Sequence, residues 1–362
     1  MLKATDFEYG VVASRPDQMY GWPGITKVND EHVIVSASER KYHVDPVGRE
    51  VVIHSDDGGE SWHLPQVVYN SELDDRDASL LTMPDGTVVL SWFTSTTFVR
   101  TVGDTDRIPQ PWRDRWRGRI ERMGLTDEVR QGWMVRSEDG GYTWGEALKT
   151  PAGHHAGPAA TADGRLVYAG TANMEGVSEV FESRNRGDSW KKIGEIQGPK
   201  PDESGQIPFN ENHIVETSSN HLLVHYRMKR ASDDDMYLHQ ATSDDGGRTW
   251  TELQKTDIWG YPAHLIQLQS GATLSCYGHR RDPYSIRAVL SYDEGETWDT
   301  DNIITLYDFD EPCDMGYPVS VELGRGEILT VFYANLKERP GHDAEAFSQE
   351  PGGIWYVRWR LK

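Results

Sequence analysis

Three residues of the chain have side chains suited to acid–base or nucleophilic chemistry, and each lies just ahead of a strand-like segment. Asp77 lies in LDDRDAS, Glu211 in PFNENHI and Tyr317 in CDMGYPV. A carboxyl group in a crowded, desolvated site can keep a proton to donate, and a phenol becomes a nucleophile when a nearby carboxylate accepts its proton. Cleavage of a glycosidic bond needs a proton donor at the leaving oxygen and a nucleophile on the opposite face of the sugar.

A repeated phrase, S-x-D/N-x-G-x-S/T-W, indicates the architecture that must bring these residues together. Its five copies are SDDGGESW (55–62), SEDGGYTW (137–144), SRNRGDSW (183–190), SDDGGRTW (243–250) and SYDEGETW (291–298). The Asp or Asn can bond its own backbone two residues on, and the Gly that follows can take a positive φ, so each copy predicts a tight turn. Regularly repeated turns of this kind are typical of propellers and solenoids.

Six hairpins are predicted besides these turns. Their sequences are ITKVNDEHVIVSA, SLLTMPDGTVVLSW, PAATADGRLVYAG, HIVETSSNHLLVHY, HLIQLQSGATLSCY and VSVELGRGEILTVFY. Five of the hairpins are followed by one copy of the repeated phrase, called a box below. This box would join the third and fourth strands of a blade. The sixth is followed by GGIWYVRWRLK without a box, so we expect the N-terminal segment EYGVVAS (8–14) to supply its fourth strand. The prediction is an all-β, six-bladed β-propeller of four-stranded antiparallel blades, forming one domain over residues 1–362.

Composition limits the partners that we expect. The 37 Lys and Arg residues against 58 Asp and Glu give a formal charge of −21, which argues against nucleic acid. Cys276 and Cys313 lack metal-ligand spacing and are expected to be free thiols. Neither a signal peptide nor a membrane-spanning stretch is recognised, so we expect a cytoplasmic protein without a membrane partner, or a secreted or periplasmic one if a signal has been removed.

An insertion over about residues 100–130 interrupts the second repeat. It contains PQPWRDRWRGRIERMG, in which a short helix is expected to start near Pro111. Long insertions in compact domains are usually functional or disordered. This one can be a lid over the propeller mouth, a contact between subunits of a homo-oligomer, or a surface excursion.

The segments just ahead of the six hairpins should crowd one mouth of the propeller, because they enter the innermost strands. They are MYGWPGI, LDDRDAS, AGHHAGP, PFNENHI, WGYPAHL and CDMGYPV. These segments supply carboxylates, imidazoles and aromatic rings. A purely structural ring would not need this polarity, so we expect a functional site there.

The boxes and the mouth segments together resemble the sialidase superfamily of BNR/Asp-box proteins over essentially the whole chain. DASLLTMPDG is similar to the segment with the acid/base, which implies that role for Asp77. NENHIVETSSNHLLVHYR implies that Glu211 polarises the nucleophile and that Arg227 belongs to the carboxylate clamp. GYPVSVELGRGEILTVFY implies Tyr317 as the nucleophile.

The first mouth segment both matches the family and departs from it. GWPGITKVNDEHVIVSASERK resembles the opening R-I-P strand with its trailing E-x-R, which implies sugar contacts for Arg40 and, after it, Asp45. Gly21 replaces the first clamp arginine, and we expect the third arginine to be Arg281 rather than Arg280 or Arg287. One arginine–carboxylate contact contributes about 1.5–3 kcal/mol, so sialic acid is expected to bind poorly, with Trp22 offering a ring for sugar stacking instead.

The resulting hypothesis is an exo-acting, sialidase-like glycoside hydrolase without a cofactor or metal. His154 and His155 have no place in the family pattern and are expected at the substrate site, in a neutral structural role or as a base. Two alternatives stay open: a polysaccharide lyase or histidine-dependent glycosidase on the same fold, and a non-catalytic glycan-binding propeller. For each candidate residue a structural role is also open, since the DDRD run around Asp77 can form a solvated turn and Glu211 can cap a strand.

Overall fold

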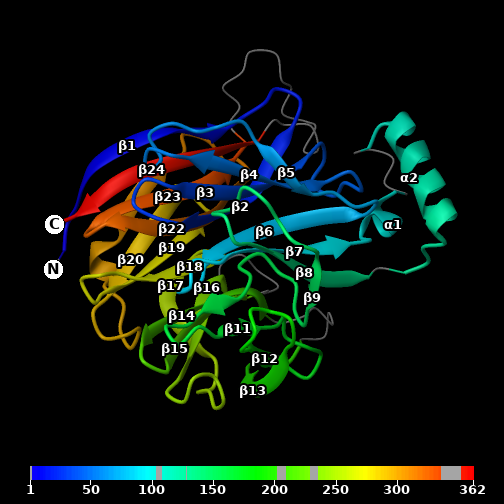
Figure 1. The fold of residues 1–362 in the computed structure, drawn as a ribbon. Helices are drawn as coiled ribbons and strands as arrows, with labels where there is room; N and C mark the ends of the chain where they lie inside the picture. Colours follow the sequence, from blue (N-terminus) through cyan, green and yellow to red (C-terminus); the bar gives the residue numbers. More distant parts are fainter. Residues whose placement is uncertain (1, 103–107, 128, 202–208, 229–234, 336–351) are drawn as a thin grey trace.

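The chain forms a ring of six four-stranded antiparallel sheets (Figure 1), which confirms the predicted six-bladed β-propeller. The structure is a computed structural model that describes residues 2–102, 108–127, 129–201, 209–228, 235–335 and 352–362. In blades 1 to 5 the four strands lie side by side in the order of the sequence, and the first of them forms one edge of the sheet. Blade 6 alone combines strands from both ends of the chain.

The blades comprise the following strands. Blade 1 has β2 (Met19–Lys27), β3 (Val33–Arg40), β4 (Arg49–Ser55) and β5 (Gln66–Tyr69), and blade 2 has β6 (Asp74–Thr82), β7 (Val88–Ser95), β8 (Arg130–Ser137) and β9 (Leu148–Thr150). Blade 3 has β10 (Ala159–Ala160), β11 (Leu166–Ala169), β12 (Val177–Ser183) and β13 (Lys191–Gln197), and blade 4 has β14 (Phe209–Ser218), β15 (His221–Met228), β16 (Tyr237–Ser243) and β17 (Gln254–Trp259). Blade 5 has β18 (Ala263–Gln267), β19 (Thr273–His279), β20 (Ser285–Ser291) and β21 (Ile304–Asp308), with a 3₁₀ turn at Thr300–Asn302, and blade 6 has β22 (Met315–Gly324), β23 (Glu327–Ala334), β24 (Gly353–Leu361) and β1 (Ala4–Ala13).

The N-terminal strand closes the ring as predicted. β1 pairs antiparallel with β24, with Glu8 opposite Arg358, and it begins four residues earlier than the expected segment 8–14. Phe7 stacks on Trp359 at a centroid distance of 6.4 Å, within an apolar cluster that joins blade 6 to blade 5. Both termini therefore lie side by side in one blade (Figure 1).

Each box forms the turn between the third and fourth strands of its blade, as the sequence indicated. In the fourth box, Asp245 Oδ1 accepts hydrogen bonds from the backbone N–H groups of Arg248 and Thr249, both at 2.9 Å, and Oδ2 accepts one from the Thr249 hydroxyl at 2.7 Å. The Ser243 hydroxyl donates to Asp245 Oδ1 and accepts from the Gly247 N–H. The Asp245 carboxylate and the Ser243 hydroxyl together satisfy these polar groups of the turn.

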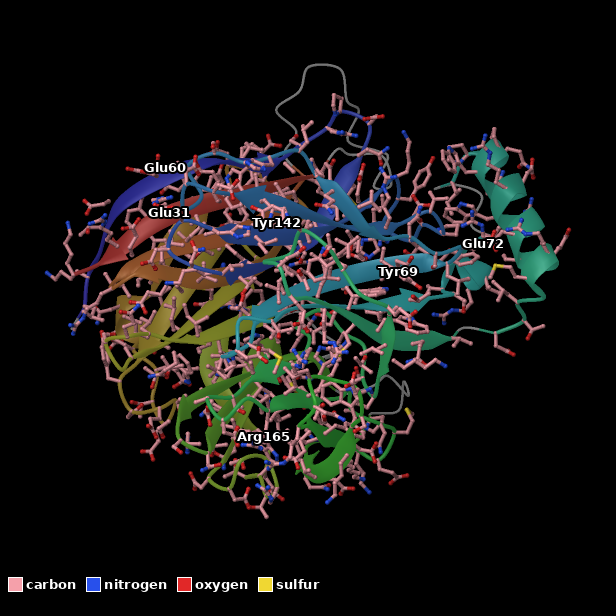
Figure 2. All side chains as sticks on the ribbon, in the orientation of Figure 1. Glu31, Glu60, Tyr69, Glu72, Tyr142 and Arg165 are labelled. Carbon is pink, nitrogen blue, oxygen red and sulfur yellow. The ribbon has the colours of Figure 1, made fainter. Side chains whose placement is uncertain are left out.

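The insertion contains α1 (Phe98–Thr101) and α2 (Gln110–Met123), which confirms the helix expected near Pro111; residues 103–107 and 128 lie outside the described part. Trp116 of α2 is buried against Phe98 and Tyr42, at centroid distances of 6.3 and 6.1 Å. Arg122 donates to the carboxylate of Glu72 at 2.6 Å, and Figure 2 shows Glu72 beside this helix. α2 therefore docks on the loops of blades 1 and 2, and none of the helices described here is long and apolar enough to cross a membrane.

The Asp245 carboxylate should stabilise the fold through its turn. Asp245→Ala removes four accepted hydrogen bonds at once, and we expect the free energy of unfolding to fall by about 1–2 kcal/mol. Urea unfolding followed by tryptophan fluorescence measures this difference. Glu252→Ala, which alters an exposed carboxylate in the same connection, is the control, and equal stability of the two variants would contradict the assignment.

Candidate functional site

A cavity of about 820 Å³ opens at the mouth of the propeller, and every blade contributes to its wall. The chain enters the first strand of each blade there, so side chains far apart in the sequence meet. From blade 1 to blade 6 in order, the wall includes Trp22, Asp77, His155, Glu211, Arg280 and Tyr317. The three residues expected to do chemistry thus line one cavity; their roles stay predictions.

Four of these residues share an unusual backbone. Trp22, Asp77, Glu211 and Tyr317 have φ values of 49°, 64°, 46° and 52°, and each lies at a register shift in the first strand pair of its blade. A bulge places two residues opposite one and redirects the side chain, while a left-handed non-glycine residue costs of the order of 1–3 kcal/mol. Recurrence of this strain at the same position of four blades makes the mouth the candidate functional site.

Tyr317, Glu211 and Arg227 form a hydrogen-bonded chain across the channel from blade 6 to blade 4. The Tyr317 hydroxyl donates to Glu211 Oε1 at 2.9 Å, and Arg227 Nη1 donates to Glu211 Oε2 at 2.6 Å. Arg227 Nη1 also lies 3.4 Å from the Tyr317 oxygen. The Glu211 carboxylate can therefore accept the phenol proton of Tyr317, while the Arg227 guanidinium holds that carboxylate in place.

The surrounding charges determine which of the two groups, Tyr317 or Glu211, carries the shared proton. Burial by itself raises the pKa of Glu211, but the charge and hydrogen bond of Arg227 and the hydrogen bond of Tyr317 lower it to about 2. Burial, and then the Glu211 charge, raise the pKa of Tyr317 well above its usual value of about 10. The pair therefore rests as a neutral phenol and an ionised carboxylate.

Asp77 is buried at the other side of the cavity, on β6. Its backbone N–H donates to the Ser38 hydroxyl at 2.8 Å, and that hydroxyl lies 3.0 Å from both carboxylate oxygens of the buried Glu50. Burial raises the pKa of Asp77, against the lowering effect of Arg76 and together with the raising effect of the Glu211 charge. The raised pKa of Asp77 and the lowered pKa of Glu211, two residues of one cavity, separate an acid from a base as acid and base catalysis require.

The cavity is rich in arginine although the protein is acidic. Its wall carries five arginines, Arg76, Arg100, Arg130, Arg227 and Arg280, against the three carboxyl groups of Asp77, Glu211 and Asp314. Positive charges that converge in a half-closed site attract anions. The cavity is therefore suited to a ligand with a negative group.

The structure places Arg280, rather than the expected Arg281, in the cavity wall. Arg281 is not in the wall; its guanidinium stacks on Trp259 at 3.9 Å from the ring centroid. Arg280 faces the cavity instead, where it donates to the Tyr333 hydroxyl at 3.1 Å and lies 3.7 Å from Asp314. The strand ends at His279, and the turn that follows decides which of two adjacent arginines faces inward.

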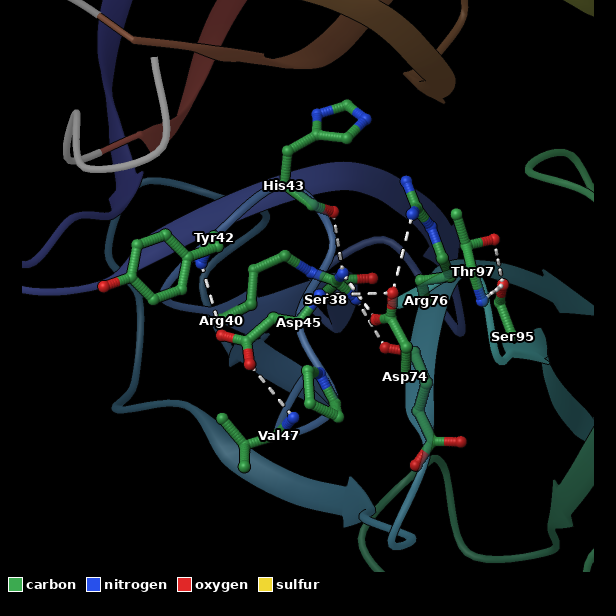
Figure 3. Close-up of polar contacts among 12 residues, drawn as sticks. Ser38, Arg40, Tyr42, His43, Asp45, Val47, Asp74, Arg76, Ser95 and Thr97 are labelled. Atoms are coloured by element: carbon green, nitrogen blue, oxygen red, sulfur yellow. Dashed lines mark hydrogen bonds and ion pairs between the residues drawn. The ribbon is translucent and has the colours of Figure 1, made fainter. Parts of the chain in front are cut away.

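Arg40 and Asp45 do not line the cavity; Figure 3 shows their contacts with neighbouring residues instead. Arg40 is fully buried and pairs with Asp74 at 2.7 Å, while its second nitrogen donates to the backbone carbonyl of Asp75. Asp45 accepts from the backbone N–H groups of Lys41, Tyr42 and Val47. Both side chains hold neighbouring loops and strands together, and neither is in the cavity wall where a sugar would bind; their predicted sugar contacts stay predictions.

Trp22 lies in the wall but offers no free ring face. Its side chain is 1% exposed, and the guanidinium carbons of Arg40 and Arg76 lie 4.8 and 4.6 Å from its ring centroid. His43 packs against it edge-on at 5.1 Å. The indole therefore positions Arg76, and the predicted stacking of a sugar on Trp22 is not available here.

His154 and His155 both line the cavity, and burial lowers the pKa of each to about 4. His154 Nε2 is 2.7 Å from the Ala169 carbonyl, so that contact holds its ring. The ring of His155 contacts Tyr317 edge-on at 4.5 Å between centroids. Within the described residues, no group of three or more His, Cys, Asp and Glu side chains is arranged to hold a metal ion.

Sequence reasoning missed Arg76, which precedes Asp77 directly. It lies 3.6 Å from Asp74 and 3.4 Å from Asp77 and faces the cavity. Neighbouring residues of a regular strand point to opposite faces, so an alternating pattern would turn Arg76 away. The bulge at this position brings both side chains to one side, and only the polarity of DDRD hinted at it.

Comparison with solved structures shows the same fold in sialidases. A Dyadobacter fermentans protein of unknown function is 21% identical, with a TM-score of 0.77 over 100% of this chain and 99% of that one. The NanB sialidase of Streptococcus pneumoniae is 14% identical, with a TM-score of 0.69 over 98% of this chain and 71% of its own. Trypanosoma rangeli sialidase, as a covalent intermediate with 2,3-difluorosialic acid, is 12% identical, with a TM-score of 0.61 over 97% and 59% of the two chains.

Family comparisons agree with the structural ones. A search of curated proteins found no significant match. The BNR/Asp-box repeat matches residues 53–64, which include the first box, and the BNR repeat-like domain family matches residues 110–329, more than half of the chain. The chain belongs to the BNR repeat-like domain family, carries the BNR/Asp-box repeat, and shares its propeller fold with the sialidases compared above.

Proposed function

We propose that the protein is an exo-acting glycoside hydrolase that releases a terminal acidic sugar of the sialic acid type. The observation that carries the proposal is the 2.9 Å hydrogen bond from the Tyr317 hydroxyl to Glu211, with Asp77 in the wall of the same cavity. A phenol bonded to an ionised carboxylate is an activated nucleophile. A neutral nucleophile suits an anomeric carbon that carries a carboxylate, because an Asp or Glu would be repelled there.

The residues would act in two steps. In the first, the Tyr317 oxygen attacks the anomeric carbon and its proton passes to Glu211, while Asp77 protonates the leaving oxygen as the glycosidic bond breaks. In the second, Asp77 takes a proton from water, the water oxygen attacks the anomeric carbon, and the phenol leaves with its proton returned from Glu211. The two inversions at the anomeric carbon retain its configuration.

Three arginines support an acidic substrate. Arg227, Arg280 and Arg76 line the cavity around Tyr317, and the Arg280 guanidinium lies 5.6 Å from the Tyr317 ring centroid. We propose that Arg76 supplies the charge that the first clamp arginine would supply, since Gly21 has no side chain to do so. The weak sialic acid binding expected from Gly21 is therefore not part of the proposal.

A histidine-dependent reaction is the second candidate, favoured by one contact. His155 touches the Tyr317 ring, and its Nδ1 has no hydrogen-bond partner among the residues that the structure describes. A lyase could use it as a base, and the product would then be an unsaturated uronate that absorbs in the ultraviolet. The hydrolase is preferred because the Tyr317 hydroxyl is bonded to Glu211, whereas His155 contacts only the ring.

Tyr317→Phe should lower kcat on an aryl α-sialoside at least about 100-fold, because it removes only the attacking oxygen. Release of the phenol measures turnover, and NMR of the first-formed sugar should show the retained anomer. Tyr69→Phe, which removes a hydroxyl on the outer strand β5 (Figure 2), is the control. Wild-type turnover of Tyr317→Phe combined with loss of turnover in His155→Ala would favour the histidine mechanism, and absence of turnover by the wild type would favour a binding propeller.

The pH dependence of kcat/KM should report Asp77 as the acid. The protonated form is the active one, so activity should be present below the raised pKa of Asp77 and be lost as the pH rises through it. On the acid side Glu211 stays ionised until the pH approaches about 2. Asp77→Asn should abolish this alkaline limb and spare aryl substrates with acidic leaving groups, whereas Asp85→Asn, at the hairpin turn of the same blade, should keep the wild-type profile.

Arg76→Gln should raise KM for the aryl sialoside by about 10- to 100-fold, since it removes one charge-assisted contact to the substrate carboxylate. Arg76→Lys keeps the charge without the planar fork and should give an intermediate value. Steady-state kinetics of the folded variants measure both effects. A KM within twofold of the wild type in Arg76→Gln would remove Arg76 from the clamp.

A further inference from the structure

A second hollow of about 530 Å³ lies between blades 2 and 3 and adjoins the cavity at the mouth. The two hollows share Arg130 and Thr171 in their walls. The remaining wall of the second hollow comes from the start of β8, residues 150–153, the connection between β11 and β12, and strand β12. The cavity at the mouth is therefore continuous, at Arg130 and Thr171, with the hollow between blades 2 and 3.

This continuation lies on the side of the candidate proton donor. Asp77 belongs to the first strand of blade 2, whereas Tyr317 and Glu211 belong to blades 6 and 4. The Phe93 ring connects the two hollows, because the guanidinium carbons of Arg76 and Arg130 lie 5.7 and 4.2 Å from its centroid. In glycoside cleavage the leaving group departs from the side of the acid that protonates it, so it would depart toward blades 2 and 3.

Arg130 differs from the other arginines that border Asp77 and Tyr317. Arg76 pairs with Asp74 and Asp77, Arg227 with Glu211, and Arg280 with Asp314. Arg130 is exposed, and no described residue forms an ion pair with it; only the Phe93 ring contacts its charge. An arginine that a ring positions at the junction of two hollows is prepared to bind an anion.

The rest of the second hollow has the chemistry of a sugar site. Gln131, Thr150, Thr171 and Asn173 contribute amide and hydroxyl groups, and Phe181 contributes a half-buried ring. The one carboxylate in the wall, Glu179, is paired with Lys192 at 2.5 Å. Polar groups around an aromatic ring suit the hydroxyls and the apolar face of a sugar.

We propose that the second hollow binds the leaving group of the proposed reaction and that Arg130 selects a leaving sugar that carries a carboxylate. The inference rests on the proposed hydrolase function and deepens it. The preferred substrate would then contain two adjacent acidic sugars, the first bound in the cavity at the mouth and the second between blades 2 and 3.

The test compares kcat/KM for an aryl sialoside, a sialyl-galactose disaccharide and a disialic acid. The wild type should prefer the disialic acid over the sialyl-galactose about tenfold or more, and Arg130→Gln should remove that preference. Phe181→Ala should lower kcat/KM for both disaccharides relative to the aryl sialoside. Lys149→Gln removes one exposed positive charge from the same blade outside both hollows and should keep the wild-type ratio.

The outcomes separate this inference from the function on which it rests. Absence of turnover with the aryl sialoside contradicts the proposed function itself. Turnover of the aryl sialoside with equal kcat/KM for the two disaccharides overturns the inference alone, and so does a preference that survives in Arg130→Gln. A loss of preference in Lys149→Gln equal to that in Arg130→Gln would show that general charge, rather than Arg130, determines the selection.

Discussion

The pairing of β1 with β24 is the constraint on which the candidate site depends. The site has walls from six blades, and Tyr317 of blade 6 must reach Glu211 of blade 4 across the channel. An open ring could splay and would separate these groups. Closure by antiparallel pairing, continued by the reciprocal hydrogen bonds between Lys3 and Lys362 at 2.9 and 3.0 Å, fixes the last blade with both ends of the chain. The boxes stabilise the turns between the third and fourth strands. Their stabilisation offsets the backbone strain at the bulges of the first strands.

That strain is concentrated where function is expected. Four blades repeat one bulge, and each places a left-handed non-glycine residue at the mouth. Neighbouring groups hold these conformations, as the Ser38 hydroxyl does for the Asp77 N–H. A bulge costs stability locally but lets two adjacent side chains, such as Arg76 and Asp77, face the same cavity. A regular strand could present only one of them.

The charged residues are also distributed unevenly between the cavity and the rest of the protein. The chain carries a formal charge of −21, yet the cavity gathers five arginines around three carboxyl groups. Most of the arginines serve two purposes, since each pairs with an acid of the site and still lines the wall. Arg227 keeps Glu211 ionised, Arg76 is positioned by Trp22, and Arg130 forms no ion pair with a described residue. A site of this kind combines attraction of an anion with control of proton positions.

The sequence by itself determined the blades, their number and the closure, because turn chemistry and hairpin patterns are local and repeat. It also brought Asp77, Glu211 and Tyr317 to one mouth, since each precedes a first strand. The tertiary structure alone decided which side chains face inward. Arg280 rather than Arg281 lines the cavity because of the turn after His279. Arg40 pairs with the buried Asp74 and therefore does not line the cavity. The Trp22 ring is covered by two guanidinium groups. Side-chain direction at bulges and turn ends depends on contacts between blades, which a strand pattern does not encode.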